Sequence, residues 1–145
     1  MYLEDYRPGV VFALGQVSIT EQEILDFGRS YDPQPFHTDL AAAADGPFGG
    51  VIASGWQTCG LTMRALVAEY FSPLSSLGSP GIDEIRWPAP VRPGDVLSVE
   101  VEVLDNRRSA SRPDRGIVRS AITSVNQQGA VVLTMNAINL VRARP

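Results

Sequence analysis

The last third of the chain alternates apolar and polar residues with a period of two, and this pattern restricts the fold more than any other. In residues 97–103, an aliphatic side chain at every odd position alternates with Ser98, Glu100 and Glu102. Such alternation is typical of a strand with one buried face and one polar face. Residues 117–125 and 131–141 are further strand candidates, and residues 126–129 between them predict a hairpin turn. Long strands joined in this way favour an antiparallel sheet.

A long apolar segment precedes these strands. Between residues 52 and 71 only Arg64 and Glu69 carry a charge. The segment has the periodicity of a helix, and Pro73 is expected to end it. Its apolar positions include Met63, Leu66, Val67 and Tyr70. A helix that is apolar on most sides is expected to be buried, so the sequence predicts an α+β fold in which an antiparallel sheet wraps around one long central helix.

Shorter elements are predicted before this helix. Residues 10–17 are a strand candidate, and Thr20 to Glu23 matches a capping box that begins a helix ending near residues 28–31. A second short helix is predicted over residues 38–44, with Thr38 as its N-cap.

Two segments of the second half read as connections. Residues 106–115 contain four arginines together with serine and proline, and predict an exposed, mobile loop. The prolines within residues 86–95 predict an edge or a bulge between two strands. No repeat or linker divides the chain, so we expect one domain over residues 1–145.

The charge and the residue usage exclude several classes of function. The formal net charge is −4 and all twelve basic residues are arginine, which argues against a nucleic-acid surface and excludes a Schiff-base or P-loop lysine. One histidine and one cysteine argue against a zinc site, and Cys59 is interpreted as a core residue. The chain starts without a basic and apolar leader and has no run of ~18 apolar residues, so we expect a cytoplasmic protein without a membrane partner.

The only histidine of the chain, His37, follows Asp32 by five residues, with Pro33 and Pro35 between them. An imidazole beside a carboxylate is a proton-transfer pair. Five fully extended residues would separate the two Cα atoms by roughly 16–18 Å, so the side chains meet only if the chain folds back. The prolines predict a stiff, non-helical segment from Asp32 to Phe36. Taken alone, the segment is also compatible with a proline-rich surface turn.

With its neighbours, this segment resembles the MaoC-like dehydratase family, the (R)-specific enoyl-CoA hydratases of the hotdog fold. The family motif Asp-x-Asn-Pro-x-His is matched by residues 32–37, which read Asp-Pro-Gln-Pro-Phe-His. Residues 50–55 resemble the glycine-containing segment that opens the long helix, and residues 84–88 and 91–95 resemble the strand and turn segments of the family. The resemblance covers nearly the whole chain and implies a single hotdog domain.

The resemblance also implies a reaction, the reversible hydration of trans-2-enoyl-CoA thioesters to (R)-3-hydroxyacyl thioesters. Asp32 and His37 match the catalytic pair that activates water. The N–H of Gly55 matches the oxyanion-hole donor, at a helix N-terminus where N–H groups are free. No metal and no cofactor is implied, because coenzyme A is part of the substrate. The implied partners are an acyl-CoA or acyl-carrier thioester and further copies of the chain, in a homodimer or a dimer-based homo-oligomer.

Three residues depart from the family pattern. Gln34 replaces the usual asparagine, Tyr31 stands where many members have glycine, and Ser54 stands where many have histidine. These three residues, together with Phe48 and Trp56, are the candidate substrate-binding residues.

Arg86 and Arg92 are candidate partners for the phosphates of coenzyme A. Two other functions stay open at this point. One is a hotdog acyl-CoA thioesterase, which hydrolyses the same class of thioester. The other is a non-catalytic acyl-thioester-binding subunit whose pocket is closed.

Overall fold

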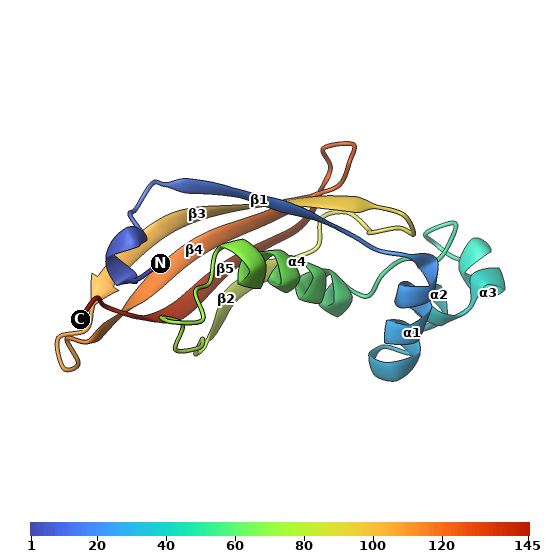
Figure 1. Ribbon diagram of the computed structural model, residues 1–145. Coiled ribbons are helices and arrows are strands. Elements are labelled where there is room, and N and C mark those ends of the chain that lie inside the picture. The colour runs from blue at the N-terminus through green and yellow to red at the C-terminus, as the bar shows by residue number, and fades with distance from the viewer.

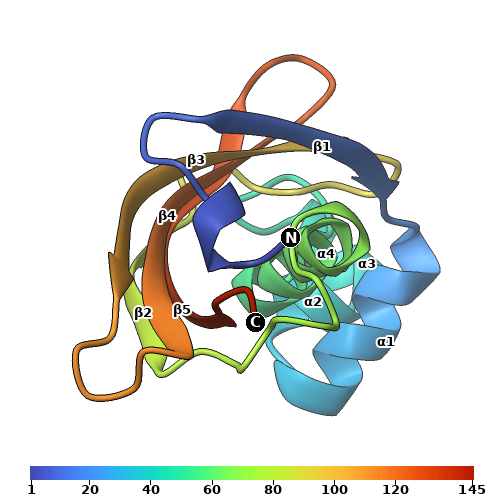
Figure 2. The ribbon, with the colours of Figure 1, turned by 60° about the vertical axis from the view of Figure 1, so that its left-hand side comes forward.

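A curved sheet and one long helix organise the molecule. In the computed structural model, which describes residues 1–145, helix α4 (Gly55–Glu69) lies in the hollow of a five-stranded antiparallel sheet (Figures 1 and 2). This arrangement confirms the predicted α+β fold with a sheet wrapped around a central helix. The helix begins at Gly55, where the sequence places it, and its last residue, Glu69, precedes Pro73.

The strands follow one another in the order β1-β3-β4-β5-β2, and every neighbouring pair is antiparallel. Their bounds are β1 Val11–Ser18, β2 Gly81–Arg86, β3 Val96–Arg108, β4 Arg115–Val125 and β5 Val131–Arg142. The edge strands are therefore β1 and β2, and the proline-containing residues 87–95 connect edge strand β2 to β3, as predicted. The predicted hairpin turn joins β4 to β5. The predicted loop over residues 106–115 is too long, because β3 continues to Arg108.

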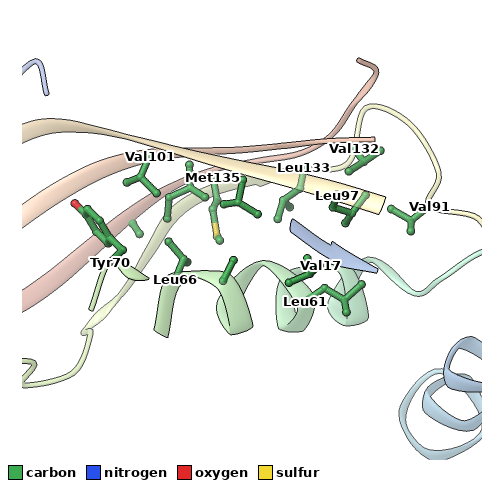
Figure 3. Packing of buried hydrophobic residues seen from close by; sticks show 14 of the residues in the cluster. Val17, Leu61, Leu66, Tyr70, Val91, Leu97, Val101, Val132, Leu133 and Met135 are labelled. Atoms are coloured by element: carbon green, nitrogen blue, oxygen red, sulfur yellow. The ribbon is translucent and has the colours of Figure 1, made fainter. Parts of the chain in front are cut away.

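The core lies between α4 and the concave side of the sheet (Figure 3). Leu97, Val99, Val101 and Val103 are all buried, which confirms the period-two pattern. Leu66 is among the α4 residues that face them, and Met135 from β5 packs at the same level. The free energy gained here comes from removing these side chains from water, typically ~1.5–3 kcal/mol for each large aliphatic residue.

Two buried pairs of hydroxyl groups connect α4 and its C-terminal end to the sheet. Thr62 and Ser124 lie 2.8 Å apart at their hydroxyl oxygens, and the Tyr70 hydroxyl lies 2.8 Å from that of Ser120. Unlike apolar contacts, hydrogen bonds have fixed partners. They therefore define how far along its axis α4 sits on the sheet.

The outward side of α4 is less buried than the sequence predicts. Trp56 is 60% exposed, Met63 42% and Val67 59%. Met63 and Val67 were expected on the apolar, buried side with Leu66 and Tyr70, and this part of the prediction is wrong. The sheet covers only one side of the helix, so an apolar composition on all sides leaves one apolar side open.

A short 3-10 helix (Leu3–Asp5) and three α-helices precede α4. Helix α1 (Glu21–Tyr31) begins with the predicted capping box, in which the Glu23 N–H donates to the Thr20 hydroxyl and the Thr20 N–H donates to the Glu23 carboxylate. Helix α2 (Pro35–Thr38) corrects the prediction of a non-helical segment up to Phe36, because proline is well suited to the first position of a helix. Helix α3 (Leu40–Ala44) is capped by Asp39 and not by Thr38, which ends α2.

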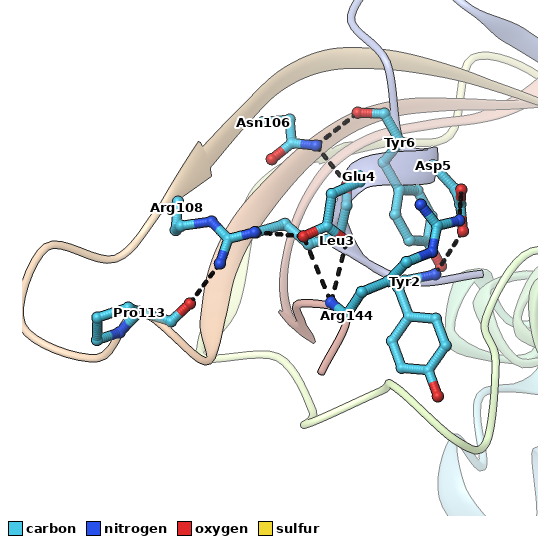
Figure 4. Close-up of polar contacts among 9 residues, drawn as sticks. All are labelled: Tyr2, Leu3, Glu4, Asp5, Tyr6, Asn106, Arg108, Pro113 and Arg144. Carbon is cyan, nitrogen blue, oxygen red and sulfur yellow. Dashed lines mark hydrogen bonds and ion pairs between the residues drawn. The ribbon is translucent and has the colours of Figure 1, made fainter.

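The N-terminal turn is attached to the far end of the sheet (Figure 4). The side-chain amide of Asn106 on β3 donates to the backbone carbonyls of Leu3 and Tyr6. Glu4 forms an ion pair with Arg108 and accepts a hydrogen bond from the backbone N–H of Arg144. These contacts lie at the opposite end of the molecule from helices α1 to α3 (Figure 1).

The longest helix has 15 residues, and none of the helices combines the length and apolar content that a membrane span requires.

Candidate active site

His37 lies on α2, where a glycine of the neighbouring helix allows the two helices to touch. A Cβ at Gly28 of α1 would lie 2.5 Å from the carbonyl oxygen of His37 and 2.9 Å from its Cβ. Only glycine fits at such a distance. The side chain of His37 is buried as a result, with 5% of its surface exposed.

Asp32 is the residue that follows α1, and the chain turns back after it. The Gln34 N–H donates to the carbonyl of Asp32, and the His37 N–H donates to the carbonyl of Gln34. This double turn brings Nε2 of His37 to 3.2 Å from Oδ2 of Asp32. The chain reversal that the sequence requires for a proton-transfer pair is therefore present.

The imidazole of His37 is oriented by a backbone carbonyl. Its Nδ1 lies 2.7 Å from the carbonyl oxygen of Ile52. A carbonyl oxygen only accepts hydrogen bonds, so Nδ1 carries a proton and donates it. The other ring nitrogen, Nε2, is thereby directed at Asp32, and it is the atom available for proton transfer.

Both carboxylate oxygens of Asp32 accept hydrogen bonds. Nε2 of Gln34 donates to Oδ1, and Oγ of Ser54 donates to Oδ2, each at 2.8 Å. Partial burial alone would raise the pKa of Asp32. The bonds from Gln34 and Ser54 and the nearby His37 act against it, and their joint effect lowers the pKa below its ordinary value.

A cavity of about 390 Å³ opens beside this pair. Its lining includes Asp32, Gln34 and His37 together with Phe48, Trp56 and residues 87–91. The Trp56 and Trp87 rings meet edge to face, with centroids 5.5 Å apart. The volume and the largely apolar lining are typical of small-molecule sites.

Gly55 is the first residue of α4 and lines the same cavity. Its N–H has no acceptor within the helix, as is general for the first turn. A Cβ at residue 55 would lie 2.5 to 2.9 Å from three ring atoms of Trp87, whose Nε1 donates to the Gly55 carbonyl at 3.0 Å. Glycine is thus required at residue 55 for the packing of Trp87.

Four of the candidate residues lie away from the cavity wall. Tyr31 is 77% exposed and packs against Phe27 in a separate groove. Ser54 is fully buried behind Asp32. The guanidinium groups of Arg86 and Arg92 are already engaged, by Glu84 and by the Phe48 carbonyl respectively.

Conversely, the sequence does not predict that Trp87 and the Ile52 carbonyl belong to the site. Trp87 is visible in the sequence, but its contact with Gly55 spans 32 residues and has no local signal. No three side chains of His, Cys, Asp or Glu come together in a way that could hold a metal ion.

Known proteins that are similar to this chain in sequence or in structure point to one family. Residues 8–126 match the model of the MaoC like domain family. A MaoC-like dehydratase from Rhodospirillum rubrum has 41% sequence identity and a TM-score of 0.92, with 100% of this chain and 99% of that chain covered. The (R)-hydratase PhaJ1 from Pseudomonas aeruginosa has 28% identity and a TM-score of 0.79, covering 99% and 86%. The 3-hydroxyacyl-thioester dehydratase Z from Mycobacterium tuberculosis is 32% identical over 134 residues, which cover 87% of this chain and 83% of the relative.

Proposed function

Since the chain belongs to the MaoC-like domain family of hotdog proteins, and its relatives support a hydratase or dehydratase activity, we propose that it catalyses the reversible (R)-specific hydration of trans-2-enoyl thioesters. The observation that carries this proposal is the contact between Asp32 and His37. Their side chains meet at 3.2 Å on the wall of a cavity that also contains the Gly55 N-terminus of α4.

In the proposed reaction, Gly55 and the Asp32–His37 pair, which line the same cavity, have different tasks. The thioester carbonyl accepts a hydrogen bond from the Gly55 N–H, where the helix N-terminus favours the negative charge that develops on oxygen. Water lies at Asp32 and His37, loses a proton as its oxygen attacks C3, and a proton is returned at C2. One oxyanion donor is worth ~2.7–4 kcal/mol in other enzymes.

The proposed substrate is an acyl group carried as a thioester of coenzyme A or of an acyl-carrier protein. The apolar walls formed by Phe48, Trp56 and residues 87–91 suit the acyl group. Water is the only other reactant, so we propose that no cofactor is needed beyond the coenzyme A that belongs to the substrate.

A spectroscopic assay separates this reaction from its alternatives. Mixing the protein with crotonyl-CoA and longer enoyl-CoA thioesters is expected to remove the conjugated absorbance band without releasing free thiol. Release of thiol would instead identify a thioesterase. An unchanged spectrum on a broad panel of acyl groups would favour a binding subunit and refute the proposal.

We also propose that the protein works as a homodimer or a larger assembly of dimers. Strand β2 is an edge strand with most of its residues exposed, and the outward side of α4 exposes Trp56, Met63 and Val67. Pairing of two copies would cover an unpaired edge and apolar surface together. Sedimentation at micromolar concentration is expected to give at least twice the monomer mass of 15.7 kDa, and a stable monomer would contradict this.

A further inference from the structure

Ser54 uses its hydroxyl in an unusual way for its position. It is the N-cap residue of α4, where a serine side chain ordinarily accepts a hydrogen bond from the N–H of the second or third helical residue. Here the side chain makes no capping bond. Instead Oγ donates to Oδ2 of Asp32 at 2.8 Å, from a position with no exposed surface. Helix α4 therefore lacks a side-chain cap, and the Asp32 carboxylate accepts an additional hydrogen bond.

The donors around the pair restrict where its protons can be. Nδ1 of His37 keeps its proton because it donates to the Ile52 carbonyl. Nε2 then lies 3.2 Å from Oδ2 of Asp32, and two bare acceptors would repel each other at this distance. An ionised carboxylate beside a protonated Nε2 is the arrangement of this pair in which opposite charges meet. Ser54 and Gln34 each donate to the carboxylate, and such bonds are stronger to an ionised acceptor than to a neutral one.

We propose that Ser54 is a positioning residue that keeps Asp32 ionised, so that Nε2 of the His37 imidazole, and not the Asp32 carboxylate, carries a proton in the resting pair. This statement about the resting pair stands on geometry alone. The roles that follow from it rest on the proposed hydration reaction. In that reaction Asp32 is the base that receives a proton from water, and His37 is the acid that protonates carbon.

The step balances with these assignments. One O–H bond of water breaks and its proton passes to the carboxylate of Asp32, while the water oxygen forms a bond to C3. The electron pair of the C2–C3 double bond moves toward the thioester carbonyl. It then returns to form the C2–H bond with the proton from Nε2 of His37. Transfer of the new proton from the Asp32 carboxyl group to Nε2 restores the starting pair.

Nuclear magnetic resonance of the imidazole tests the proton position without any substrate. His37 is the only histidine, so the ring signals of ¹⁵N-histidine-labelled protein belong to one residue. Asp32 and His37 are also the only titratable side chains that line the cavity. At neutral pH both ring nitrogens are expected to show the shifts of protonated nitrogen. A signal of unprotonated Nε2 would overturn the proposal, whether or not the protein is a hydratase.

Ser54→Ala tests the role of the serine. Loss of a hydrogen bond to a charged group is expected to move the acid limb of the pH–rate profile upward by about one pH unit, because the carboxylate then takes up a proton more readily. The matched control is Ser124→Ala, which also removes a fully buried serine hydroxyl, bonded there to Thr62. The control is expected to keep the wild-type acid limb.

A second variant covers the case in which Ser54→Ala does not fold. Gln34 is exposed and donates to the other carboxylate oxygen, so Gln34→Leu is expected to fold and to shift the acid limb in the same direction. An unchanged acid limb in a folded Ser54→Ala protein, or in Gln34→Leu where Ser54→Ala does not fold, would overturn the proposal. If no variant and no wild-type protein hydrates enoyl thioesters, the proposed function fails, and the ¹⁵N spectrum still decides the position of the proton.

Discussion

Gly28→Ala tests how the fold holds the Asp32–His37 pair. The added Cβ would lie 2.5 Å from the carbonyl oxygen of His37 and 2.9 Å from its Cβ. Neither atom can be moved by rotating a side chain. We therefore expect α1 and α2 to separate, which displaces His37 relative to Asp32.

The structure gives the size of this effect. Ordinary van der Waals contact begins at 3.4 Å, so the two helices must move apart by nearly an ångström. Overpacking costs ~1–3 kcal/mol, whereas replacing a helical glycine with alanine gains ~0.5–1 kcal/mol. The free energy of unfolding should therefore fall by only ~0–2.5 kcal/mol. Misplacing a catalytic group by ~1 Å lowers rates by about 10²-fold, so turnover should fall much more than stability.

Gly60→Ala is the matched control, because Gly60 is also a helical glycine but has no neighbouring atom within 4 Å of the place that an added methyl group would take. This variant should gain ~0.5–1 kcal/mol and keep near-normal turnover. Both variants are measured by loss of the enoyl absorbance and by denaturant unfolding. Wild-type turnover in Gly28→Ala would refute the inference that this glycine sets the position of His37.

Three further outcomes are expected. Asp32→Ala and His37→Ala should each lower kcat by ~10²–10⁴-fold with an unchanged circular dichroism spectrum, and near-normal hydration of crotonyl-CoA by either folded variant would contradict their roles. Burial raises the pKa of Asp32, but the hydrogen bonds to its carboxylate and the nearby His37 lower the pKa by more than burial raises it. The ionised carboxylate of Asp32 therefore stabilises the fold fully above the unfolded-state pKa, and this stabilisation is lost as pH falls through the folded-state pKa. The melting temperatures of wild type and Asp32→Asn should therefore converge in acid, and a difference that does not change with pH would exclude this. Hydration in deuterated water should add hydroxyl and deuterium to the same face and give the (R) product; an (S) product or anti addition would exclude a mechanism with one dyad on one face.

The sequence predicts those parts of the fold that depend on local patterns. The alternation around Val99 and Val101 identifies β3, and the glycine at residue 55 marks the start of α4, because strand alternation and helix termini are local properties. The pairing of Asp32 with His37 could also be predicted from the sequence, since both residues lie in one short segment.

Features that depend on contacts between distant segments could not be predicted from the sequence. Tyr31 adjoins Asp32 in sequence, yet it is the last residue of α1 and points into a different groove, because successive helical residues face different directions. The hydroxyl of Ser54 reaches Asp32 across 22 residues. Neither the direction of a side chain at the end of a helix nor a hydrogen bond between distant segments leaves a periodic signal in the sequence.

The charges on edge strand β2 also bear on aggregation. An exposed strand edge can seed endless stacking of identical strands, as in amyloid. In such a parallel, in-register stack, Asp83, Glu84 and Arg86 would each lie against their own copies, and like charges placed opposite one another are unfavourable. An antiparallel pair centred on Ile85 would instead set Glu84 opposite Arg86 of the second copy. The six residues of β2 would therefore suit the proposed closed pair of chains better than a growing fibril.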